Sequence, residues 1–144
     1  MPRSTIVREA AFVEEAGPPF FCWHHHDAAA PARDLVAVLC PPIGSEYTRS
    51  HRSIRHLADR FAAAGIPAIR FDYHGTGDSP GNDLDPDRLA AWRANVVDAC
   101  ARARAWSGRS RVALVGVRLG GTIAALASDS GCVVSGLIAV TSIT

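Results

Sequence analysis

Four largely apolar runs, each about the length of one buried strand, constrain the fold of this chain more than any other feature. A continuous apolar run indicates a strand that is covered on both of its faces. Between these runs, apolar residues recur with the spacing of a helix. Strands that alternate with helices predict an α/β fold with a doubly wound, mostly parallel sheet and helices on both faces. The runs are residues 35–40, 67–73, 111–117 and 135–142, and the helices are expected at 48–64, from Pro86 to the residue before Gly108, and at 119–128.

Two further strands are expected near the N-terminus. Residues 5–14 and 19–26 are short and β-prone, and the turn Ala-Gly-Pro-Pro separates them. Since no repeat or linker interrupts the pattern, residues 1–144 are expected to form a single domain.

Charge and composition exclude several classes of function. The chain has 15 basic and 14 acidic side chains and a formal net charge of +1, which gives no electrostatic reason to expect nucleic acid or an anionic membrane as partner. No apolar run approaches the roughly 20 residues that span a bilayer, and the polar N-terminal segment is not a signal peptide. We therefore expect a cytoplasmic protein. The four cysteines are widely spaced and are expected to be small buried side chains: Cys22, Cys40, Cys100 and Cys132.

The segment after the third run, residues 116–120, is the strongest candidate for a functional site. It reads Gly-Val-Arg-Leu-Gly and joins a buried strand to a helix rich in small residues. This matches the nucleophile elbow, G-x-S-x-G, in everything except its centre, where Arg118 replaces serine. The glycines are expected because side chains beside the strained turn would collide with neighbouring backbone.

A second segment, residues 72–79, supports the same interpretation. It reads Asp-Tyr-His-Gly-Thr-Gly-Asp-Ser and follows the strand at 67–73. At this point the chain resembles the α/β-hydrolase superfamily, in which a D-x-x-G-x-G-x-S segment precedes the elbow. The segment Pro-Pro-Ile-Gly-Ser-Glu-Tyr-Thr, from Pro41, resembles more narrowly the serine-aminopeptidase-like or exosortase-associated hydrolases, a subgroup in which an arginine can occupy the elbow. The resemblance implies that Asp72, His74 and Ser79 shape their loop.

The resemblance also implies an oxyanion loop between the first run and the first helix. Backbone N–H groups of Ile43 or Gly44, together with that of Leu119, would be the donors to an oxyanion. The resemblance covers most of residues 35–142 and implies only the N-terminal portion of the fold. The domain is therefore expected to be incomplete at its C-terminus, and the strand at 135–142 is expected to be an exposed apolar edge. We expect that the chain is poorly soluble, dimerises through this edge, or is an excerpt of a longer protein.

Arg118 changes the chemistry that such a site can perform. A guanidinium stays protonated and is no nucleophile, and the acid and histidine of a triad would follow later strands. Glu46 is the natural partner of Arg118, and we expect an ion pair within about 4 Å that plugs the site. Alternatively, Arg118 and the amides of Leu119 and Gly120 form an anion site for a small carboxylate or phosphate.

No metal or cofactor is expected. His24, His25 and His26 alternate along one strand and cannot present three rings to one ion, so they are expected to be surface imidazoles. The residues favour a non-catalytic protein of the hydrolase fold, or a fragment of one. The alternative is hydrolysis of an ester, thioester or amide bond by an unrecognised nucleophile or by segments absent from the chain.

Overall fold

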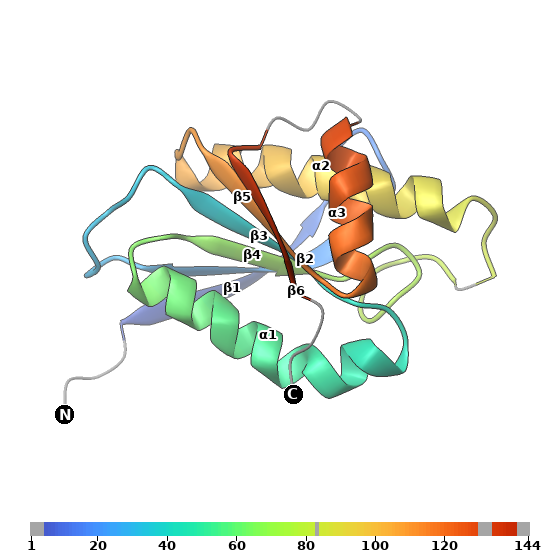
Figure 1. Ribbon diagram of the computed structural model, residues 1–144, viewed down its shortest axis with the longest axis horizontal. Coiled ribbons are helices and arrows are strands. Elements are labelled where there is room, and N and C mark those ends of the chain that lie inside the picture. The colour runs from blue at the N-terminus through green and yellow to red at the C-terminus, as the bar shows by residue number, and fades with distance from the viewer. Residues whose placement is uncertain (1–4, 83, 130–133, 141–144) are drawn as a thin grey trace.

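A six-stranded sheet forms the centre of the protein (Figure 1). The computed structural model describes residues 5–82, 84–129 and 134–140. In the sheet the strands follow the order β1-β2-β4-β3-β5-β6, and β2 alone runs against the other described strands. The mostly parallel sheet predicted from the sequence is therefore confirmed. The strands are β1 (Ile6–Val13), β2 (Phe20–Asp27), β3 (Val36–Cys40), β4 (Ala68–Phe71), β5 (Val112–Val117) and β6 (Gly136–Val140).

Three helices cover the two faces of this sheet. Helix α1 (Ser45–Ala63) lies on one face, and α2 (Arg88–Ser107) and α3 (Leu119–Asp129) lie on the other, as Figure 1 shows. This arrangement confirms the doubly wound fold. Within the described residues, no helix has the length and apolar character needed to cross a bilayer.

Strand β3 shows why an unbroken apolar run is needed in the middle of the sheet. Val36, Val38 and Cys40 pack on the side of α2 and α3, whereas Ala37 and Leu39 pack on the side of α1. All five residues are buried, so both faces of the strand contribute to the core. Cys22 and Cys100 are buried like Cys40, while Cys132 lies outside the described residues.

Two helices begin at other residues than the sequence predicted. Helix α1 starts at Ser45 and not at Thr48, directly after Gly44 with its φ of 71°. Its first turn carries polar residues, so the apolar spacing does not reveal it. Helix α2 starts at Arg88, two residues after Pro86. The earlier start of α1 places Glu46 in a helix and not in a loop.

The expectation that the strand histidines lie at the surface is wrong for two of them. His24 and His25 are 3% and 0% exposed. Strand β2 lies between β1 and β4, so α2 covers one of its faces and α1 the other. His24 accordingly packs against Trp106 of α2 and accepts a hydrogen bond from Arg102 at 3.3 Å.

Candidate active site

Arg118 is the single residue between β5 and α3, and its backbone has the left-handed conformation of an elbow. Its φ is 56°, and among the described residues only Asp87 shares a positive φ without being glycine. The Arg118 amide donates to the carbonyl oxygen of Val140 at 2.8 Å, and its own carbonyl accepts from the Gly121 amide at 2.9 Å. The turn is therefore fixed on both sides by backbone hydrogen bonds.

Three glycines allow this turn to pack as tightly as it does. A Cβ on Gly116 would overlap the backbone of Gly121, and one on Gly120 would overlap the carbonyl oxygen of Cys40. Gly121 lies against Ala139 of β6, where a Cβ would be 3.2 Å from the Ala139 Cβ. The predicted collision with neighbouring backbone is thus present at Gly116 and Gly120, on either side of Arg118.

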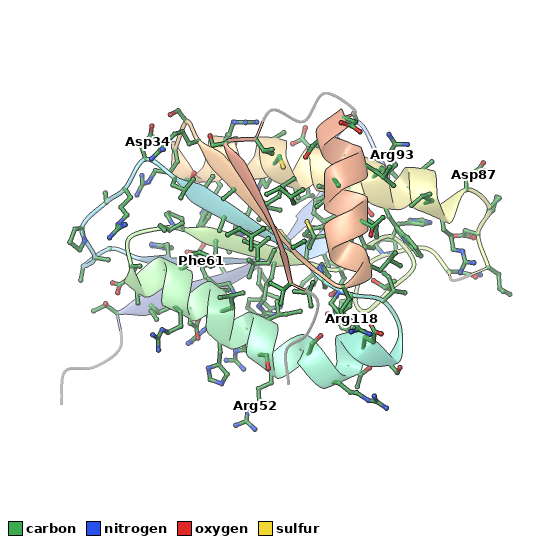
Figure 2. All side chains as sticks on the ribbon, in the orientation of Figure 1. Asp34, Arg52, Phe61, Asp87, Arg93 and Arg118 are labelled. Atoms are coloured by element: carbon green, nitrogen blue, oxygen red, sulfur yellow. The ribbon has the colours of Figure 1, made fainter. Side chains whose placement is uncertain are left out.

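Arg118 and Glu46 form the ion pair that the sequence predicted. The Nη2 and Oε1 atoms are 2.9 Å apart, and Nε and Oε2 are 3.1 Å apart, so the guanidinium binds the carboxylate through two parallel hydrogen bonds. Figure 2 shows Arg118 beside the first turn of α1, which carries Glu46. Both nitrogen–oxygen distances are well below the expected limit of about 4 Å.

The ion pair between Arg118 and Glu46 is more exposed than a plug inside the site would be. The side chains of Arg118 and Glu46 are 48% and 43% exposed, so neither charge is buried. The hydrogen bond from Arg118 lowers the pKa of Glu46, and the hydrogen bond to Glu46 raises the pKa of Arg118. Both groups therefore stay charged around neutral pH, and Arg118 does not give up a proton to a substrate.

The four other residues predicted for an oxyanion site lie around the same turn. Gly44 caps α1, Ile43 packs against the core, and Leu119 is exposed. Gly120 touches the backbone of the Cys40–Pro41 segment, because the ends of β3 and β5 are paired through Cys40 and Gly116. The two loops are therefore neighbours, as the resemblance implies. Their action as oxyanion donors stays a prediction.

The loop from Asp72 to Asp85 is held by its own polar side chains. One Asp72 carboxylate oxygen accepts from the Asp78 amide at 2.9 Å, and the other accepts from the hydroxyl of Tyr47. Ser79 donates to the Asp72 carbonyl at 2.6 Å and accepts from the Phe21 amide at 2.8 Å. These contacts agree with a loop-shaping role for Asp72 and Ser79 and leave the Ser79 hydroxyl committed to structure.

Sequence reasoning missed one histidine–carboxylate pair in this loop. His74 Nε2 lies 2.9 Å from Asp85 Oδ2. The hydrogen bond from His74 and one from the Asn82 amide lower the pKa of Asp85. The pair joins the two ends of a glycine-rich loop. Its two residues are eleven positions apart, and no sequence pattern links them. No group of three metal-ligating side chains occurs in the part of the chain that the structure describes.

One comparison with known proteins identifies a family. The sequence profile described as serine aminopeptidase, S33, matches residues 43–142. No match was found among curated proteins.

The fold is similar to that of several solved hydrolases. They include an α/β serine hydrolase without a lid from Xanthomonas campestris (19% identity, TM-score 0.73, covering 91% of this chain and 60% of that one). An α/β serine hydrolase homologue from Coxiella burnetii is 17% identical, with a TM-score of 0.74 and coverage of 91% and 61%. A dienelactone hydrolase-like promiscuous phosphotriesterase from metagenomic libraries is 21% identical, with a TM-score of 0.68 and coverage of 94% and 59%. The present chain thus spans about 60% of the length of these structures.

Proposed function

The chain belongs to the serine aminopeptidase S33 family, within the α/β-hydrolase fold, and from this premise we propose that it does not hydrolyse substrates at the elbow. In a hydrolytic elbow the central side chain attacks the substrate after losing a proton to a base. Arg118 occupies that position here, and a guanidinium neither loses its proton at working pH nor acts as a nucleophile. The protein is then a non-catalytic member of its family.

One observation supports this proposal above all others: the two-bond contact between Arg118 and Glu46. Their nitrogen–oxygen distances are 2.9 and 3.1 Å, so the side chain at the predicted nucleophile position is engaged in an ion pair. The pair joins the turn after β5 to the first turn of α1.

The same contact supports one of the two roles that the sequence left open for Arg118. An anion site at the Leu119 and Gly120 amides would need the positive charge of Arg118. Glu46 already supplies an anion to that guanidinium, and an incoming carboxylate would have to displace it. The geometry therefore favours a plug over an open anion site.

The proposal is tested by measuring ester turnover and serine labelling side by side. The unaltered protein and Arg118→Ala are given p-nitrophenyl acetate and a fluorescent fluorophosphonate. We expect neither protein to exceed the background rate or to take up the probe. Turnover by the unaltered protein that co-purifies with it through two columns, and falls in Arg118→Ala, would overturn the proposal.

Hydrolysis by another nucleophile is the alternative. The chain spans about 60% of the length of its structural neighbours. Any activity of a whole protein of that length is therefore a proposal. Labelling of any serine, with turnover unchanged in Arg118→Ala, would support this alternative. Mass spectrometry of the labelled peptide identifies the serine.

We also propose that a second copy of the chain pairs with strand β6. Leu137 and Ile138 are 41% and 54% exposed, and β6 is paired on one side, with β5. Its free edge offers unpaired backbone groups and apolar side chains. We expect concentration-dependent dimers in analytical ultracentrifugation, and fewer of them in Ile138→Lys. Identical monomeric sedimentation of both proteins at all concentrations would refute the pairing.

A further inference from the structure

A small cavity lies between α1 and the part of the sheet formed by β2 and β4. Its volume is about 190 Å³. Trp23 and Phe21 of β2, Tyr47 and Ile54 of α1, and Arg70 of β4 contribute to its wall. We call this cavity the Arg70 pocket. It lies on strands other than β5, which carries the elbow, so binding in this pocket is independent of the proposed function.

Arg70 reaches the pocket because of the alternation along β4. Ile69 and Phe71 pack on the side of α2 and α3, and Ala68 packs on the side of α1. Arg70 therefore points to the α1 side, where its neighbour across the strand pair is Trp23. The Arg70 guanidinium carbon lies 5.4 Å from the centre of the Trp23 ring, an arrangement typical of a cation–π contact.

A buried histidine fixes one nitrogen of this guanidinium. Arg70 Nε donates to His25 Nε2 at 2.9 Å, and His25 Nδ1 lies 2.8 Å from Asp59 Oδ1. Since Nε2 accepts, Nδ1 carries the proton and donates it to Asp59. Burial lowers the pKa of His25, which keeps the ring neutral and able to accept. Nε of Arg70 is thus directed away from the pocket.

The charge of Arg70 is nevertheless not matched by a carboxylate. Asp59, the acid of this network, binds Arg8 through two contacts of 2.7 and 2.9 Å. Asp72 also lines the pocket, but its oxygens accept from Tyr47 and the Asp78 amide. Among the described residues, no carboxylate lies within salt-bridge distance of Arg70, and none accepts a hydrogen bond from its terminal nitrogens.

We propose that the Arg70 pocket binds a small monocarboxylate that carries a short apolar or aromatic group. The carboxylate would accept hydrogen bonds from the terminal nitrogens of Arg70, whose planar fork suits a carboxylate. The apolar group would lie against Trp23 and Ile54. Asp72 and Asp59 attract the Arg70 charge without direct contact, and a ligand carboxylate would add direct hydrogen bonds to its terminal nitrogens.

Size and charge narrow the class of ligand further. A volume of about 190 Å³ is below the range of roughly 300–1,000 Å³ that is typical of ligand pockets, so a compact molecule is required. Asp72 and Asp78 both line the pocket. Their negative charges repel any anion, and they repel a dianion such as phosphate more strongly than a monocarboxylate, so a single carboxylate is the anion that the pocket would tolerate best.

Benzoate is a suitable probe, with benzamide and benzylamine as its neutral and cationic counterparts. Binding is followed by heteronuclear NMR on the full chain. We expect saturable shifts of the Trp23 indole and the Ile54 methyl groups with benzoate, and none of comparable size with benzamide or benzylamine. Equal affinity for benzamide, or shifts that cluster elsewhere, would overturn the proposal.

Two variants and a control test the role of Arg70 itself. Arg70→Met removes the charge but keeps the length, and we expect it to weaken benzoate binding by about tenfold or more, because hydrogen bonds to charged groups are lost. Arg52→Met removes an exposed arginine of α1 that does not line the pocket, and should bind benzoate as before. Unchanged binding by Arg70→Met would refute the assignment.

If Arg70→Met does not fold, Trp23→Leu replaces it. This variant keeps the guanidinium and removes the aromatic wall. We expect it to weaken benzoate binding while acetate, which has no ring, binds as it does to the unaltered protein. An equal loss for both carboxylates, or no loss for either, would count against the pocket.

Discussion

Two ion-pair networks, one at the elbow and one beneath α1, place similar groups in opposite surroundings. At the elbow, Arg118 and Glu46 are both nearly half exposed. Beneath α1, His25 is fully buried and the Asp59 side chain is 15% exposed, and both belong to a chain of contacts from Arg8 to Arg70. Exposed pairs contribute little to stability, whereas removal of one partner from a buried pair is costly. The elbow pair therefore affects what the site can do, and the network beneath α1 affects whether the chain folds.

The largest expected difference comes from removing one acid from each network. Asp59→Ala leaves His25 without its acceptor and Arg8 without its partner, and we expect it to lower the free energy of unfolding by about 3 kcal/mol. Glu46→Ala should leave the urea midpoint unchanged within error. Urea denaturation followed by circular dichroism measures both. Equal losses in the two variants would remove the distinction between the networks.

The next largest effect on stability is expected at the glycines of the elbow, which do not take part in the ion pair. Gly120→Ala would force a Cβ against the Cys40 carbonyl oxygen, and we expect a loss of about 2 kcal/mol, as in overpacked cores. Gly136→Ala is the matched control, because its Cβ would meet no atom within 4 Å. Thermal denaturation of both variants gives the comparison. A Gly120→Ala protein as stable as the control would show that the elbow is loosely packed.

A smaller effect is expected from the titration of the buried histidine. Burial is the main cause that lowers the pKa of His25 below its ordinary value of 6.5. The folded state therefore binds fewer protons than the unfolded state as the pH falls below about 6.5, and the free energy of unfolding should decrease there. His24 has a lowered pKa for the same main reason and contributes in the same direction.

The variant His25→Asn tests this assignment. An asparagine can still donate to Asp59 but does not titrate in this range. We expect the free energy of unfolding of the variant to change less between pH 7 and pH 5 than that of the unaltered protein. Identical pH dependence of the two proteins would mean that folding does not shift the pKa of His25.

The smallest expected effect concerns the backbone at position 118. Its positive φ of 56° is unfavourable for arginine and free of strain for glycine. Arg118→Gly should therefore melt at a slightly higher temperature than Arg118→Ala, although both lose the ion pair. A higher melting temperature for Arg118→Ala would mean that the turn does not keep this conformation in solution.

Much of the fold could be predicted from the sequence, because β3 and β5 must be apolar on both faces. The elbow was recognisable from Gly116 and Gly120, since only glycine permits such close backbone contacts. The partner of Arg118 could be predicted because Glu46 follows a neighbouring strand. These features depend on local patterns or on the general order of an α/β sheet.

The network beneath α1 could not be predicted in the same way. His25 lies 34 residues from Asp59 and 45 from Arg70, and no short motif links them. Its visible signal was a polar residue, Arg70, inside a strand that otherwise reads as buried. The three adjacent histidines were expected at the surface, but His24 and His25 are buried because β2 lies inside the sheet between β1 and β4.

The glycine frame around Arg118 has a consequence for how this protein could change over evolutionary time. The backbone of the elbow is fixed by Gly116, Gly120 and two backbone hydrogen bonds, none of which involves the Arg118 side chain. Several arginine codons differ from serine codons by a single nucleotide. A point mutation could therefore exchange the side chain at the elbow without rebuilding its support, and the difference between a charged plug and a hydroxyl at this position is small in genetic terms.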